Sequence, residues 1–315
     1  MGDFRLGALL WTQATSWPEM RDAALRIDDA GYDHLWFYDH LYAINTRDPF
    51  LPIFEGWSIL AGLATVTHRA GLGLLVGANT FRNPGVVAKI ASTVDHMSDG
   101  RVIVGLGGAW NDFEHRAFGL EFGSSAGERL GWLDEAAGTI RSALDGVAVS
   151  SGPDDHYRFD ELRILPSPLQ DRVPIMIGGS GERRTLRAVA RHADMWNLFG
   201  DADRLAVKDE VLRRHCEEVG RDEAEIERTV SAKLVIRDTA DEALEVWSAQ
   251  MERNRCPEED WDDSTELWLG PPSSIADEIL SRRAVGFDTF IGMLAAPFDN
   301  ETIDRLIGEV RQMVE

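Results

Sequence analysis

The chain has 315 residues, of which 44% are hydrophobic and 27% charged, so it can bury a large core and is not a disordered polymer. Its 54 Asp and Glu residues outnumber its 32 Lys and Arg residues, and the net charge of −22 disfavours nucleic acids and anionic membrane surfaces as partners. Two cysteines define no disulfide framework, and no apolar run reaches the length of a membrane span or a signal peptide. We therefore expect a soluble, reduced, cytoplasmic protein.

Short apolar runs alternate with segments of helical period in the first half of the chain. Ser16 and Glu19 form a capping box that predicts the start of the first helix, and Gly31 predicts its end. The expected strands are residues 4–11, 34–38, 72–76 and 101–106. The expected helices are residues 16–31, 54–66, 83–97, a short segment after 111, and 128–144.

Residues 146–172 interrupt this alternation and predict a β-hairpin insertion, because they alternate weakly around central turn residues. The alternation then resumes, with strands expected at 174–177, 194–198, 229–236 and 289–294. Helices are expected at 184–192, 205–219, 241–253, 274–284 and from 300 onward. Residues 254–268 form a variable acidic segment, interpreted as a solvated loop or as a lid that sets substrate choice.

Eight strands, each followed by helix, predict an α/β fold of the (β/α)8 TIM-barrel type with insertions. Several strands are apolar throughout, as in a parallel sheet that is covered on both faces. A doubly wound sheet is the alternative. No long linker divides the sequence, so residues 1–315 are expected to form a single domain.

The expected strand at 34–38 ends in Asp39 and His40. In a barrel of this type the active site lies at the carboxyl ends of the strands, so this pair is a candidate for binding a polar ring and moving a proton. A helix cap and a structural histidine are the alternative interpretations. The spacing of His34 and His40 does not fit a metal site.

Two glycine-rich turns follow later strands. Gly107 and Gly108 suggest backbone close to a flat ligand, or a simple tight turn. The second turn favours a phosphate site, since small residues before a helix expose backbone amides and Arg183, Arg184 and Arg187 could supply cations. A glycine-rich turn followed by a solvated arginine helix face is the alternative. This turn consists of Gly178, Gly179, Ser180 and Gly181.

Polar and aromatic side chains accompany other strand ends. Asn79 and Thr80 follow the third expected strand and suit ligand contacts, although helix capping is an equally good explanation for this segment. Trp11, Trp110 and Trp196 lie at or near strand ends and could form an apolar wall for a planar substrate.

Taken together, five motifs resemble the luciferase-like monooxygenase superfamily, and most closely its coenzyme F420-dependent oxidoreductase branch. The resemblance covers most of the chain from Phe4 to Trp196. The motifs are Phe37-Tyr38-Asp39-His40-Leu41, Thr80-Phe81-Arg82-Asn83-Pro84, residues 93–101, Gly105-Leu106-Gly107-Gly108-Ala109-Trp110-Asn111 with Glu114-His115, and Gly178-Gly179-Ser180-Gly181-Glu182.

The resemblance implies a barrel that binds a flavin-like cofactor at its carboxyl-end mouth. Asp39 and His40 would lie beside the reactive carbon of the ring, and Leu75-Val76 matches the position of a non-prolyl cis peptide that supports the ring face. The remaining cofactor contacts implied by position are Asn79, Thr80, Gly107, Gly108, Asn111, and the turn Gly178, Gly179, Ser180 and Gly181 with Arg183.

One departure from the pattern bears on the reaction. The sugar-phosphate-oxidising members have a Glu proton donor after the glycines of the fourth strand, and Trp110 stands in its place here. We therefore expect hydride transfer between reduced coenzyme F420 and a small organic substrate, with His40 as the acid–base residue and Asp39 orienting it or contacting the ring. An FMN-dependent monooxygenase that activates O2 is the alternative, and a non-catalytic flavin carrier is a third hypothesis. The resemblance also implies a homodimer, for which the apolar helix at 54–66 would offer an interface.

Overall fold

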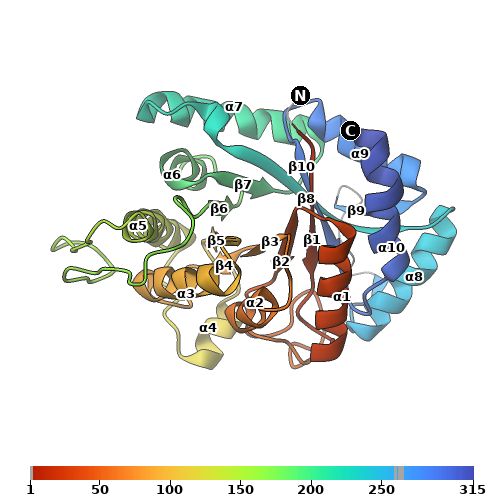
Figure 1. Ribbon diagram of the computed structural model, residues 1–315, viewed down its shortest axis with the longest axis horizontal. Coiled ribbons are helices and arrows are strands. Elements are labelled where there is room, and N and C mark those ends of the chain that lie inside the picture. The colour runs from red at the N-terminus through yellow and green to blue at the C-terminus, as the bar shows by residue number, and fades with distance from the viewer. Residues whose placement is uncertain (1–2, 259–260, 262–265) are drawn as a thin grey trace.

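Each expected strand belongs to one parallel sheet in the computed structural model, which describes residues 3–258, 261 and 266–315 (Figure 1). The last barrel strand pairs with both the first strand and the one before it in space, and this double pairing closes the barrel. The prediction of a (β/α)8 barrel is therefore confirmed, and the doubly wound sheet is wrong. In order around the barrel, the strands are β1 (Arg5–Leu10), β2 (His34–Phe37), β3 (Gly71–Leu74), β5 (Val102–Gly107), β6 (Ile175–Gly178), β7 (Met195–Leu198), β8 (Glu227–Ile236) and β10 (Thr289–Leu294).

Two short strands were not expected from the sequence. β4 (Gly77–Ala78) pairs with the end of β5, and β9 (Leu267–Gly270) pairs with the last residues of β8. β9 was hidden because it follows the acidic run, which carries no alternating pattern. Residues 259–260 and 262–265, the centre of that run, lie outside the described residues, so the predicted lid has no structural account.

Helices surround the barrel on its outer side (Figure 1). The capping box expected at Ser16 and Glu19 is present at the first of them. The helices are α1 (Trp17–Ala30), α2 (Gly56–Ala64), α3 (Pro84–Met97), α4 (Asp112–Phe118), α5 (Ala126–Leu144), α6 (Thr185–His192), α7 (Ala202–Val219), a 3₁₀ turn (Glu223–Glu225), α8 (Ala240–Arg253), α9 (Pro272–Arg283), α10 (Asn300–Arg305), a π turn (Leu306–Val310) and α11 (Arg311–Val314). Within the described part of the chain, no helix is long and apolar enough to cross a membrane.

The apolar residues of α2 are buried inside this chain. Trp57, Ile59, Leu60 and Leu63 belong to the layer between barrel and helices. The expectation that this helix offers an exposed apolar interface is therefore wrong, and the homodimer itself stays a prediction.

Strand alternation sorts the core into two layers. Leu35 and Phe37 of β2 face outward into the layer beneath the helices, whereas Trp36 and Tyr38 face the barrel interior. Along β7, Trp196 faces outward in the same way. This parity decides which side chains after each strand can reach the barrel mouth.

The insertion at 146–172 is a hairpin-shaped loop with a single antiparallel bridge, between Val149 and Leu162, and no regular strands. Two backbone amides that a β-ladder would pair with carbonyl groups donate instead to serine side chains. Ser151 Oγ accepts from the Phe159 amide at 2.7 Å, and Ser150 Oγ accepts from the Glu161 amide at 3.0 Å. Side-chain competition of this kind opposes regular strand pairing. The predicted β-hairpin is thus correct in outline and wrong in its strands.

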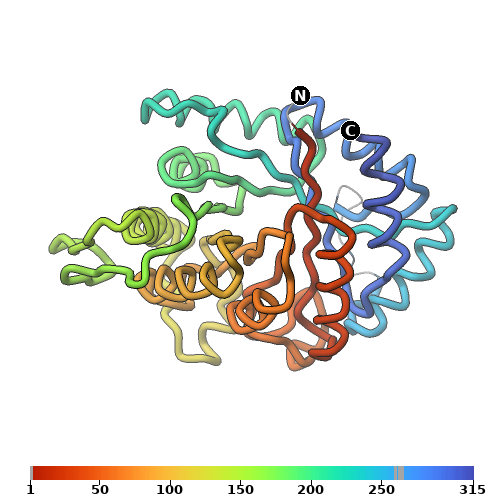
Figure 2. The backbone as a smooth tube through the Cα atoms, in the orientation of Figure 1, coloured from red at the N-terminus to blue at the C-terminus, as the bar shows by residue number. Residues whose placement is uncertain are grey.

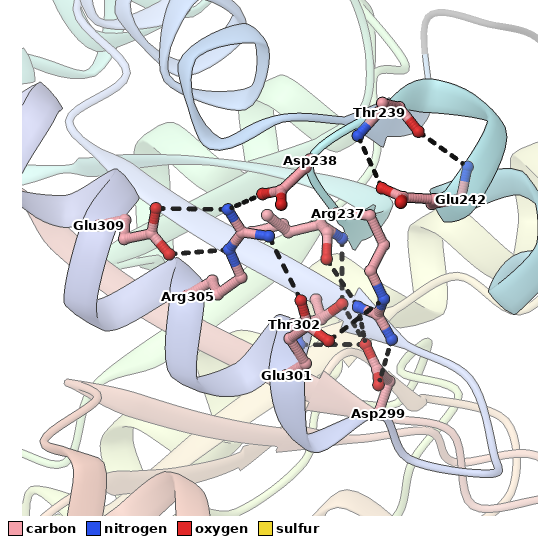
Figure 3. Close-up of polar contacts among 10 residues, drawn as sticks. Arg237, Asp238, Thr239, Glu242, Asp299, Glu301, Thr302, Arg305 and Glu309 are labelled. Atoms are coloured by element: carbon pink, nitrogen blue, oxygen red, sulfur yellow. Dashed lines mark hydrogen bonds and ion pairs between the residues drawn. The ribbon is translucent and has the colours of Figure 1, made fainter.

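A charged network fastens α10 to the end of β8 (Figure 3). Arg237 donates to both carboxylate oxygens of Asp299, at 2.8 and 2.9 Å, and Asp299 caps α10 by accepting from the Thr302 amide. The Thr302 hydroxyl in turn accepts from the Ile236 amide at 3.0 Å. These bonds therefore fix the position of α10 relative to the end of β8.

The two ends of the chain lie side by side (Figure 2). Arg283 of α9 stacks over the Phe4 ring at 5.2 Å and donates to the carbonyl oxygen of Val314. The same guanidinium thus holds the approach to β1 and the end of α11 together.

Candidate active site

A cavity of about 660 Å³ opens at the carboxyl ends of the barrel strands. Almost every barrel strand contributes to it, as expected for this architecture. Its wall includes Tyr38, Asp39, His40, Ile44, Leu75, Val76, Phe81, Gly107, Gly108, Trp110, Asn111, Glu114, His115, Arg129, Gly178, Gly179, Ser180, Gly181, Thr185, Asn197, Phe199, Arg204, Lys233, Glu266 and Met293.

His40 is paired with a buried carboxylate. Its Nδ1 lies 2.8 Å from Glu114 Oε1, and the Glu114 side chain is only 1% exposed. The second oxygen of Glu114 accepts from the backbone amides of Leu41 and Tyr42, at 2.5 and 3.2 Å. Burial raises the pKa of Glu114, but the bonds from His40 and these amides outweigh burial and lower the pKa overall. Glu114 therefore stays ionised and fixes the imidazole.

Local sequence places Glu114 at this point. Asn111 caps α4 by accepting from the Phe113 amide at 3.1 Å, and Glu114 follows on the first turn. His40 comes two residues after Tyr38 and shares its inward parity. The dyad thus joins the end of β2 to the helix that follows β5.

Asp39 has the opposite parity and a different partner. Arg82 donates to both of its oxygens, at 2.7 and 2.8 Å, and the Ala78 amide donates to one of them at 3.0 Å. Arg82 also pairs with Glu55, the N-cap residue of α2. The expectation that Asp39 orients His40 is therefore wrong, because Arg82 holds the Asp39 carboxylate and Glu114 holds the imidazole. The alternative, that Asp39 contacts the ring, stays a prediction, since Asp39 also lines the cavity.

His115 lines the cavity beside the dyad but is bonded on both ring nitrogens. A carbonyl can only accept, so Nδ1 donates to the Asn111 carbonyl oxygen at 2.7 Å, and Nε2 accepts from the Thr80 hydroxyl at 2.6 Å. Thr80 thereby supports the wall from behind and does not itself line the cavity. Asn79 is also buried behind the wall, and its side-chain nitrogen has no hydrogen-bond partner among the residues that the structure describes.

The peptide bond between Leu75 and Val76 is cis, as the family resemblance implies, and both residues line the cavity. Val76 projects against two of the predicted glycines. A Cβ on Gly107 would lie 2.5 Å from Val76 Cγ2, and one on Gly178 would lie 3.0 Å from Val76 Cγ1. Only glycine fits at these strand ends while Val76 keeps its place.

The second glycine turn forms one end of the cavity, as expected, but Arg183 is exposed on the outside. Arg129 and Arg204 line the wall instead. Arg184 donates to the Gly127 carbonyl and so brings the first turn of α5 against the glycine turn. Arg129 stacks over Phe122 at 3.8 Å, and its buried Nε has no hydrogen-bond partner among the described residues.

The aromatic wall differs from the expected one. Trp110 lines the mouth, is 63% exposed, and packs edge-on against His40 at 5.6 Å. Trp196 does not line the cavity, because its parity turns it outward, where its indole nitrogen donates to the Gly179 carbonyl. Trp11 is buried among Tyr38 and Trp247 and is likewise absent from the wall.

Sequence reasoning gave no role to several wall residues. Glu114 stands three residues after the Asn111 N-cap, where an ordinary capping interaction explains a glutamate equally well. Arg129 begins a helix and resembles a solvated residue. Lys233, one of only three lysines, lies within a strand and was the clearest available signal.

Comparison with known proteins identifies relatives. Residues 4–293 match the model of a family described as luciferase-like monooxygenase. An uncharacterized protein of Mycobacterium bovis is 30% identical over 156 residues, which are 47% of this chain and 51% of that one. The match thus spans about half the length of this relative.

Two other relatives carry functional names. An F420-dependent glucose-6-phosphate dehydrogenase of Nakamurella multipartita is 28% identical over 73% of this chain and 68% of its own length. A pyrimidine monooxygenase of Stutzerimonas stutzeri is 29% identical over 77% of this chain and 63% of its own. The solved coenzyme F420-dependent tetrahydromethanopterin reductase of Methanopyrus kandleri shares the fold, with a TM-score of 0.81 at 17% identity over the full length of both chains.

Proposed function

The chain belongs to the luciferase-like monooxygenase family, and we propose that it transfers a hydride between reduced coenzyme F420 and a small organic substrate. Relatives in this family are oxidoreductases or monooxygenases that use F420 or a flavin. The observation that carries the proposal is the His40–Glu114 dyad, which lines the same cavity as the Val76 side chain.

The cavity fits a flat ring with a phosphate-bearing tail. The glycines at 107 and 178 add no side chains of their own and let Val76 pack closely against their backbone, which gives a wall against which a planar ring can lie. Arg129 and the backbone amides of the glycine turn both line the cavity and offer donors for a phosphate. When bound, the deazaflavin supplies the hydride, and the protein supplies orientation and proton transfer.

His40 would hold or deliver the proton that accompanies hydride transfer. Glu114 engages Nδ1, so Nε2 is the nitrogen that can exchange a proton with the substrate. Trp110 lies over the imidazole at the mouth and would limit the access of water to this nitrogen. Asp39 would act indirectly, because its bonds with Arg82 and the Ala78 amide fix the end of β2.

The first experiment is a paired titration of the protein with oxidised coenzyme F420 and with FMN, followed by ligand and Trp fluorescence. Tight F420 binding with weak FMN binding supports the proposal. The reverse result supports the alternative, an FMN-dependent monooxygenase, which oxygen consumption with reduced FMN would then establish. Tight binding of either cofactor with no redox exchange with any acceptor would indicate a carrier.

The phosphate end has its own prediction. We expect Arg129→Met to weaken binding of the phosphate-bearing cofactor about tenfold or more, because a charge-assisted hydrogen bond is worth about 1.5–3 kcal/mol. The dephosphorylated form, riboflavin in the case of FMN, should bind equally to both proteins. Arg183→Met is the matched control and should leave both affinities unchanged. Equal losses for both ligands in Arg129→Met would show that the residue does not read the phosphate.

A further inference from the structure

Arg204 is an exposed cation on the wall of the cavity. Its backbone amide donates to the carboxylate of Asp201, the N-cap residue of α7, at 2.8 Å. Its guanidinium group makes no hydrogen bond or ion pair with any residue that the structure describes. The charged end of this side chain is therefore available to a ligand.

The first turn of α7 directs the Arg204 side chain back toward the end of β7. Side chains in a helix lean toward its amino end, and Arg204 is the third residue of α7. The stem of the side chain lies over Gly200, because a Cβ on Gly200 would come within 2.8 Å of Arg204 Cδ. The glycine thus leaves room for the stem as it runs toward the cavity wall.

The glycine turn at 178–181 lies between Arg204 and Arg129. Gly178 is the register partner of Asn197, so this turn and the residues that follow β7 leave the sheet next to each other. The helix after the turn, α6, packs against α5 on one side and α7 on the other (Figure 1). Arg129 belongs to α5 and Arg204 to α7, so the two cations flank the turn from opposite sides.

The acidic residue beside the glycine turn has another partner. Glu182 Oε1 lies 2.6 Å from Lys208 Nζ, and His215 of the same helix donates to the Glu182 carbonyl oxygen at 2.7 Å. Lys208 follows Arg204 by one helical turn, and Arg204 is the one of the two that lines the cavity. Glu182 is therefore neutralised by Lys208 and not by Arg204.

We propose that Arg204 binds the acidic tail of the cofactor, beyond the phosphate that the glycine turn and Arg129 would hold. Coenzyme F420 carries glutamyl carboxylates on a linker after its phosphate, whereas FMN ends at the phosphate. A guanidinium group binds a carboxylate through two parallel hydrogen bonds, and a local cation offsets the repulsion of such a tail by a chain of net charge −22. This inference rests on the proposed function for its choice of cofactor, and it makes Arg204 a residue that distinguishes F420 from FMN.

The test compares two ligands that differ only in the tail, coenzyme F420 and the 5′-phosphate of its deazaflavin nucleoside. In fluorescence titrations, the unaltered protein should bind F420 about fivefold more tightly than the tail-free phosphate, which is the scale of one partly exposed ion pair. Arg204→Met should bind F420 as weakly as the tail-free phosphate, and Arg204→Lys should keep part of the difference. Added salt should reduce the difference in the unaltered protein.

Arg183→Met is the matched control, because it removes one exposed positive charge near the turn from outside the cavity. It should keep the fivefold difference between the two ligands. The tail-free phosphate also reports on the integrity of the site, since it should bind Arg204→Met and the unaltered protein equally. Equal affinity of the unaltered protein for both ligands would overturn the proposal. An equal loss for both ligands in Arg204→Met would also overturn it, because Arg204 would then act at the phosphate itself.

These titrations separate the inference from the proposed function. If the tail strengthens binding through Arg204 but bound F420 exchanges no hydride with any acceptor, the tail site stands and the redox function falls. If hydride transfer proceeds with both ligands at the same affinity, the function stands and the inference fails. Binding of FMN with no binding of either deazaflavin would overturn both.

Discussion

His40 and Asp39 are adjacent in sequence, yet strand parity gives them separate roles. Both residues line the cavity, but Arg82 and the Ala78 amide hold the Asp39 carboxylate, whereas Glu114 holds the His40 ring. Each carboxylate is paired with its own cation or imidazole. Of the two cationic or imidazole partners, His40 carries the ring that can exchange a proton near neutral pH, and we propose it as the acid–base residue of the reaction.

We expect His40→Ala to lower kcat about a hundredfold or more with a confirmed substrate, as is usual on removal of a general acid. Glu114→Gln should lower kcat about tenfold, because it removes a charge-assisted bond to the ring. Cofactor titration serves as the control and should give similar affinities for both variants. A His40→Ala enzyme with near-normal kcat would show that another group moves the proton.

At the scale of the element, the end of β3 and the end of β5 are fitted to each other. Gly107→Ala places a Cβ 2.5 Å from Val76 Cγ2, so either Val76 or the strand must shift. We expect reduced stability together with weaker cofactor binding, measured by thermal unfolding and fluorescence titration. Gly308→Ala is the matched control, since its Cβ would meet nothing within 4 Å. Unchanged cofactor affinity in Gly107→Ala would remove Val76 from the ring site.

The α10 anchor gives a second prediction at this scale. Asp299→Asn should lower the free energy of unfolding by about 2 kcal/mol at neutral pH, because it weakens both the helix cap and the pair with Arg237. Asp304→Asn, which alters an exposed pair with Arg26, should cost about 0.5 kcal/mol or less. Urea unfolding measures both values, and equal losses would contradict the assignment.

The pH dependence of this anchor follows from the Asp299 carboxyl. Burial raises its pKa, but bonds from Arg237 and Thr302 outweigh burial and hold the pKa below the ordinary 3.8. Its stabilising effect is therefore complete above pH 3.8 and is lost as the pH falls through the lowered pKa. The stability difference between the unaltered protein and Asp299→Asn should shrink over that acidic range.

The sequence predicted the elements better than the side chains between them. All eight barrel strands were found because their apolar runs are covered on both faces, and strand ends marked the correct edge of the barrel. The cis bond at Leu75-Val76 came from the resemblance alone. The Glu114 partner and the inward position of Arg129 depend on how α4 and α5 pack, which no local pattern encodes.

At the scale of the whole molecule, charge is distributed unevenly. The chain carries a net charge of −22, yet Arg129, Arg204 and Lys233 all line one cavity. Exposed charges act over about 8–10 Å at physiological salt, so a ligand inside the cavity responds mainly to the charges of the wall, which include these cations as well as Asp39, Glu114 and Glu266. The acidic surface therefore favours solubility without preventing an anionic cofactor from binding.

Arg283 contacts both Phe4 and Val314, so the two ends of the chain lie close together. A barrel closed by β1 and β10 has no intrinsic first strand, and the two termini meet beside the amino end of β1, away from the cavity at the opposite rim. A short peptide joining them, with a new opening cut in the surface loop at 152–156, should yield a circular permutant that folds and binds cofactor normally. If so, the barrel does not depend on which of its strands comes first in the sequence.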